Sequence, residues 1–212
     1  MIKKVSTLAV YCVLAMCSVA NASSTVPTVA KASNFILIDQ QGSAHELFYL
    51  KDKKAIVIMA YDGKGKEALS SVADFQALNS HFADKNVTFI LLYSHAVGDG
   101  EEIKEWRQSM PASFPVLLDE TQYIAKSLGL THSGQSVLID PQEWKIRYQG
   151  PLENKGTAYL KNSIELLLTN GSTVVQENMT SAATKLVFDK PQKNPSYHSD
   201  IAPLLQQKCV SC

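Results

Sequence analysis

The sequence predicts an α/β fold with three layers around a mixed β-sheet. Residues 55–60 and 87–93 are continuous apolar runs, which are typical of strands buried on both faces. Between them, residues 66–84 carry apolar side chains at intervals of three and four, as an amphipathic helix does. Two later runs, 136–139 and 145–148, predict an antiparallel pair across a turn of Asp, Pro, Gln and Glu. Strands that alternate with helices and end in such a pair favour a sheet with helices on both faces.

The remaining elements can be placed in chain order. Residues 35–38 and 45–50 predict an N-terminal β-hairpin around Gly42. Four further elements have clear ends: a charged helix at 101–109 before Pro111, a short strand at 114–119, a helix at 121–128 before Gly129, and a closing helix at 156–168. The whole body therefore spans residues 33–171.

The N-terminal residues 1–22 have the pattern of a Sec-type signal peptide. Two lysines precede a mostly apolar stretch, and Ala20-Asn21-Ala22 supplies the small residues that signal peptidase requires. The stretch is too short for a comfortable membrane span, so we expect an exported, periplasmic protein without stable membrane insertion. Cleavage would remove Lys3 and Lys4 from 20 basic residues and leave 18 against 20 acidic ones. That balance excludes an electrostatic footprint for nucleic acid.

The C-terminal residues differ from the body in composition. Residues 172–196 lose the regular periodicity and contain two prolines, which predicts a linker. Within it, residues 185–188 (Lys-Leu-Val-Phe) are one signal of order and could pair along an edge. Residues 197–212 predict a short helix that begins a further domain and then stops.

The body resembles a known superfamily in one stretch above all. It reads F-P-V-L-L-D-E from Phe114, A-K-S-L-G-L-T from Ala125, and V-L-I-D-P from Val137. This is similar to the redoxins, the superfamily of peroxiredoxins and thiol–disulfide oxidoreductases. The resemblance implies a thioredoxin-like fold with an N-terminal hairpin, and it covers roughly residues 33–171.

The resemblance also shows where this chain departs from the family. Redoxins place a nucleophilic Cys in the turn after the strand at 55–60, where the following helix lowers the pKa of the thiol. By position, Gly63 stands in place of that Cys, and Lys66 stands where a second Cys would follow. The proline that redoxins carry before a later strand falls at Gly134. The resemblance thus implies a redoxin domain without catalytic residues of its own.

Cys209 and Cys212 are the only cysteines left after export, and their C-x-x-C spacing suits a redox dithiol, half of a zinc site or a haem attachment site. Zinc would need two more Cys or His ligands, and none is near these two cysteines. Residues 197–212 resemble the opening of a small bacterial cytochrome c domain, where a D-I-A-P helix leads to C-V-S-C-H. The resemblance implies covalent haem c on both thiols, with an axial His as the next residue after Cys212.

These observations predict a redoxin-like scaffold or docking module that precedes a c-type haem domain and serves an electron-transfer partner or a fused downstream domain. We expect no bound haem in these 212 residues alone. Two alternatives remain open. Cys209 and Cys212 could act as a transplanted dithiol in a thiol–disulfide oxidoreductase or peroxidase-like enzyme. The cleft near residues 62–66 and His132 could instead bind a ligand or partner without catalysis.

Overall fold

The structure is a computed structural model that describes residues 30–63, 66–95, 113–170, 175–177, 179 and 183–188. The predicted signal peptide, the helix at 101–109, and Cys209 and Cys212 lie outside the described residues. Within them, no helix is long and apolar enough to cross a membrane.

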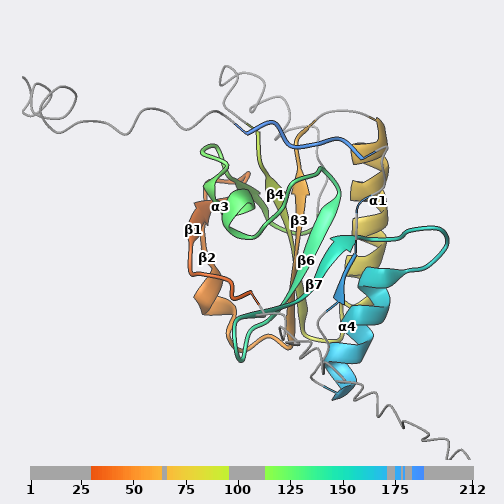
Figure 1. Cartoon of the computed structure of the whole chain (residues 1–212). Coiled ribbons are helices and arrows are strands. Elements are labelled where there is room, and N and C mark those ends of the chain that lie inside the picture. The colour runs from red at the N-terminus through yellow and green to blue at the C-terminus, as the bar shows by residue number, and fades with distance from the viewer. Residues whose placement is uncertain are drawn as a thin grey trace, which may run out of the picture.

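A six-stranded mixed sheet forms the centre of the molecule (Figure 1). Strand β3 (Ala55–Tyr61) is fully buried and pairs in parallel with β4 (Val87–Tyr93) and antiparallel with β6 (Gln135–Asp140). The strand order is β5-β4-β3-β6-β7-β8, where β5 is Val116–Leu118, β7 is Lys145–Pro151 and β8 is Val175–Gln176. Both faces of β3 carry apolar side chains because both faces of the sheet are covered.

Helices α1 (Lys66–His81) and α4 (Tyr159–Asn170) cover one face of the sheet. Phe75 of α1 and Ile164 of α4 share one apolar cluster with Val57, Met59 and other residues of that face. The second face is covered by α3 (Tyr123–Ser127), the hairpin strands β1 (Ile36–Ile38) and β2 (Ala44–Glu46), and the short 3-10 helix η1 (Leu47–Leu50). The predicted three-layer, thioredoxin-like fold is confirmed.

Some element bounds differ from those predicted. The second hairpin strand, predicted at 45–50, ends at Glu46, because the chain turns into η1 and buries Leu47 in the core. The helix predicted from residue 121 begins at Tyr123, since the Asp119 carboxylate accepts hydrogen bonds from the N–H groups of Ile124 and Ala125. A side chain outside the helix thus satisfies its first donors.

Part of the predicted linker contacts the body. Strand β8 adds a parallel edge to β7, and the N–H of Glu177 donates to the Gln149 carbonyl. Further along, Leu186 is buried in the same cluster as Ile124 of α3. Apart from edge pairing of residues 185–188, the contacts at 175–177 and 183–188 had not been predicted. The division of the chain at residue 172 stays a prediction.

Candidate functional site

The turn after β3 is the position at which redoxins carry their nucleophile. Here Gly63 has φ of +76°, a conformation that favours glycine. A Cβ added to Gly63 would lie 2.9 Å from Cε2 and 3.0 Å from Oη of Tyr93, the last residue of β4. Tyr93 is almost completely buried, so its ring cannot easily move aside. The space in which a side chain at position 63 would begin is filled by the tyrosine ring.

Gly134 lies across from this turn, immediately before β6. Its φ is +79°, and a Cβ there would lie 3.0 Å from Oγ of Ser71 on α1. Its N–H donates a 2.8 Å hydrogen bond to the carbonyl of Ala60. A proline has no N–H and a fixed negative φ, so it could not occupy this conformation. The described residues contain no cis peptide bond.

The two loops are joined by Ser133. Its Oγ accepts a 3.2 Å hydrogen bond from the N–H of Asp62, and both residues are buried. The loops that contain Gly63 and Gly134 are therefore joined by hydrogen bonds. Lys66 begins α1, so it stands at the start of the helix where the second Cys would be.

Residues 183–188, which we call the crossing segment, run across the loop that contains Gly134. The N–H of Ser133 donates to the Thr184 carbonyl, and the N–H of Leu186 donates to the Thr131 carbonyl, both at 2.9 Å. The side chain of Gln122 donates to the Val187 carbonyl at 2.9 Å. Residues 185–188, which we predicted could pair along an edge, instead pair with the loop at 131–133.

His132 pairs with Lys185 of the crossing segment in an isolated β-bridge. Burial and the nearby Lys185 ammonium hold the pKa of His132 below its ordinary value of 6.5. Its ring nitrogen Nδ1 lies 2.9 Å from Oγ1 of Thr131. None of these described contacts of the imidazole is with a thiol or a carboxylate. They therefore give His132 no partner for an acid–base pair.

Asp119 is a fully buried residue whose N–H donates a 2.9 Å hydrogen bond to the carbonyl of Tyr93 at the end of β4. Burial raises the pKa of Asp119, and hydrogen bonds from two backbone N–H groups and from Oγ of Ser94 oppose that effect. These bonds cap α3, so Asp119 has a structural role. Within the described part of the chain no group of three His, Cys, Asp or Glu residues could hold a metal ion.

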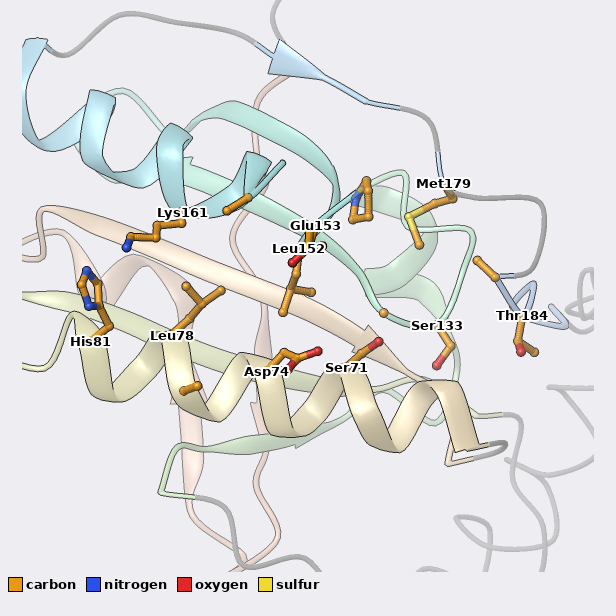
Figure 2. A pocket seen from close by; sticks show the side chains of 15 residues that line it. Ser71, Asp74, Leu78, His81, Ser133, Leu152, Glu153, Lys161, Met179 and Thr184 are labelled. Atoms are coloured by element: carbon orange, nitrogen blue, oxygen red, sulfur yellow. The ribbon is translucent and has the colours of Figure 1, made fainter. Parts of the chain in front are cut away.

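A groove of about 600 Å³ lies between α1 and α4. Figure 2 shows its walls: Ser71, Asp74, Leu78 and His81 from α1 face Leu152, Glu153 and Lys161 across it. Ser133, Gly134, Thr184 and Met179 line the end next to the turn after β3. We predicted a cleft at 62–66 and His132. The described cavity instead lies on the α1–α4 side and contacts that region only at one end.

Sequence reasoning missed this groove, although one signal was present. Residues 71, 74, 78 and 81 recur at intervals of three and four, so they share one side of α1. Three of these four residues are polar, and this marks a stripe that does not face the core. The opposite wall could not be found in this way, because it comes from residues about 75 positions later that only the sheet topology brings near.

Solved structures with this fold come from several bacteria. A hypothetical protein from Sinorhizobium meliloti is 18% identical, with a TM-score of 0.66 over 78% of this chain and 96% of its own. A protein from Chlorobium tepidum, assigned as the thiol:disulfide interchange protein DsbE, is 16% identical, with a TM-score of 0.57 over 66% and 96%. Peroxidoxin BcpB from Mycobacterium tuberculosis is 19% identical, with a TM-score of 0.53 over 68% and 98%. At these identities the likeness shows the fold alone.

Comparison of sequences gives the family. No curated protein matches the chain at a significant level. The model of the AhpC/TSA family matches residues 29–153, more than half of the 212 residues. This range includes β3, the turn with Gly63 and the loop with Gly134 described above. The chain belongs to the AhpC/TSA family.

Proposed function

We propose that the body of this chain is a redoxin domain that has lost thiol chemistry and serves as a scaffold beside a c-type haem domain. The observation that carries the proposal is the turn at Gly63, where a tyrosine ring fills the place of a nucleophilic side chain. The sequence has no cysteine between Cys17 and Cys209, so no other residue of the body supplies a thiol. A redoxin attacks peroxides or disulfides through a thiolate, and without one it cannot begin the reaction.

The redox chemistry of the protein then lies at Cys209 and Cys212. In haem attachment each thiol adds across one vinyl group of the haem: sulfur bonds to one vinyl carbon and the thiol hydrogen goes to the other. No electron acceptor is needed for that addition. Support comes from the C-V-S-C spacing, from the resemblance of residues 197–212 to a cytochrome c opening, and from the signal-peptide pattern, since this attachment follows export.

The body would hold the haem domain near its electron-transfer partner. The crossing segment supports this role, because it anchors the chain to the body before the haem-binding residues follow. Its anchors are the buried Leu186, two backbone–backbone hydrogen bonds and one bond from the Gln122 side chain to the Val187 carbonyl. A chain fixed at this point has less freedom than one released at residue 172, so the positions open to the next domain are fewer.

The test is expression of the full reading frame, with its own leader, in a bacterium that matures c-type cytochromes. We expect periplasmic protein with covalent haem, measured by haem staining on a denaturing gel and by the pyridine haemochrome spectrum. The Cys209→Ser, Cys212→Ser double variant should lose the haem and keep the circular dichroism spectrum of the body. Wild-type protein that is exported and folded but carries no covalent haem would overturn the proposal.

The second candidate is a thiol–disulfide enzyme that uses Cys209 and Cys212 as its dithiol. The crossing segment favours it, because this segment leads the chain past Ser133 and Gly134, beside the turn at which redoxins react. A Cys209 or Cys212 thiolate would attack a substrate disulfide, and the second thiol would release the reduced substrate, leaving a Cys209–Cys212 disulfide for an external dithiol to reduce.

Reduction of insulin by dithiothreitol measures this activity directly. The wild-type chain would accelerate precipitation of the insulin B chain, and the Cys209→Ser, Cys212→Ser variant would not. Equal rates for the two proteins would exclude the dithiol enzyme. The haem assay is independent of this result, so the two candidates can fail separately.

A further inference from the structure

The α1–α4 groove has the size of a small-molecule site and lies outside the turn that concerns the proposed function. Its volume of about 600 Å³ falls within the range usual for ligand pockets. Small residues, Ala77 of α1 and Ala158 before α4, stand on facing walls and leave the space between the helices open. The apolar cluster beneath the groove joins α1 and α4 to the sheet.

Some charged residues of the groove have an ion-pair partner and others have none among the described residues. The Lys161 ammonium already has an acidic partner, since its Nζ lies 3.9 Å from Oε1 of Glu165, and Nε2 of His81 lies 4.0 Å from the same oxygen. Asp74 and Glu153 have no ion pair or hydrogen bond of their side chains among the described residues. Figure 2 shows these two carboxyl groups near the middle of the groove, one from each wall. The charge that the groove lacks is therefore positive.

Part of the remaining lining is apolar. Leu78 and Leu152 are partly buried against the core, and Met179 covers the end near the crossing segment. A hydrocarbon chain placed along them would leave water, and each buried CH₂ group contributes about 0.8 kcal/mol in transfer from water. A fitting ligand thus combines an apolar body with a single positive group.

We propose that the α1–α4 groove binds a primary ammonium group carried on an apolar chain, with Asp74 and Glu153 as its counter-ions. A protonated amine has three N–H donors, and it can donate to carboxylates on both walls at once. An anion of the same length would meet the two carboxylates, and the Lys161 ammonium already has Glu165 as its partner. The site discriminates by charge, and the apolar walls supply most of the affinity.

The experiment compares three probes of equal chain length, n-octylamine, n-octanol and n-octanoate, on the full chain labelled with ¹³C at the methionine methyl groups. The Met179 methyl group lines the groove, whereas Met59 is fully buried in β3 and serves as the internal control. We expect n-octylamine to shift the Met179 signal and leave the Met59 signal in place. Its affinity should exceed that of octanol by about fivefold or more at low salt, the scale of two exposed ion pairs.

Variants identify the residues. Asp74→Asn and Glu153→Gln should each weaken octylamine binding about threefold and leave octanol binding unchanged. Glu120→Gln, an exposed carboxyl outside the groove, is the matched control and should bind octylamine as the wild type does. All three positions are exposed, so the folds should survive, which circular dichroism checks. The proposal is overturned if octanoate binds as tightly as octylamine, if the Met179 signal does not move, or if the double variant Asp74→Asn, Glu153→Gln keeps the wild-type preference.

Discussion

The turn after β3 and the α1–α4 groove meet at Ser133 and Gly134, but a side chain fills the space at the turn whereas the groove is open. At the turn, the Tyr93 ring occupies the space beside Gly63, and the backbone of Asp62 is bonded to Ser133. In the groove, two carboxyl groups and an apolar wall face open space. A chain can thus keep the fold of its family while a side chain fills the turn at Gly63. The neighbouring α1–α4 groove is then more accessible to a ligand than that turn.

The crossing segment contacts both regions, and its anchor gives the largest expected effect. Leu186→Ala should lower the free energy of unfolding by about 2–5 kcal/mol, because it leaves a cavity in the core cluster. Val187→Ala is the matched control: this side chain is 80% exposed, and the change should stay within about 0.5 kcal/mol. Urea denaturation measures both. Equal effects would mean that the segment is not part of the folded body.

The filled turn can be tested with glycines that share its conformation. Gly63→Ala should cost about 2–3 kcal/mol, from the positive φ and from the contact with Tyr93. Gly156→Ala is the control, since Gly156 has φ of +78° and no atom within 4 Å of an added Cβ, and it should cost about 1–2 kcal/mol. A Gly63 variant as stable as the Gly156 variant, by thermal unfolding, would show that the ring does not fill the site.

Ser136 lies on β6 between the two regions, two residues after Gly134. Its side chain is on the same face as Leu138, which packs in the α1–α4 cluster, and its buried Oγ has no hydrogen-bond partner among the described residues. Ser136→Ala should therefore be neutral or stabilise by up to about 1 kcal/mol. Ser94→Ala removes a hydroxyl that donates to Asp119, and it should destabilise by about 1 kcal/mol. A clear loss of stability in the Ser136→Ala variant would show that the Ser136 hydroxyl makes a hydrogen bond in the folded protein.

The smallest expected effect is a change in the pKa of His132. Lys185→Gln should raise the pKa of His132 toward 6.5 without reaching it, since burial, the larger cause, remains. For a base with a lowered pKa, the contribution to stability is complete above pH 6.5 and is lost as the pH falls through the lowered value. That loss should be smaller in the variant. An NMR titration of the imidazole measures the pKa, and Lys155→Gln is the control. An unchanged pKa of His132 in the Lys185→Gln variant would show that Lys185 does not lie close to this loop.

The sequence was sufficient for the sheet and its helices because their apolar periods are long and regular. The runs at 55–60 and 87–93 appear as strands within one residue of their predicted bounds. That Gly63 and Gly134 stand at the family's Cys and Pro positions stays a prediction from position alone. The filling of the turn was not predicted, because Tyr93 reaches it through the pairing of β3 with β4. The contacts of the crossing segment join residues more than 50 positions apart, and no local pattern encodes them.

Strand β8 has a consequence for how the chain can be divided. In an otherwise complete sheet, β7 would present a row of unpaired backbone groups, and an exposed edge of this kind is a template for association between molecules. Residues 175–177 cover part of that edge. A chain ended at residue 171 would expose it together with the hollow that Leu186 fills. Such a fragment should self-associate at concentrations where a chain extended past residue 188 remains monomeric.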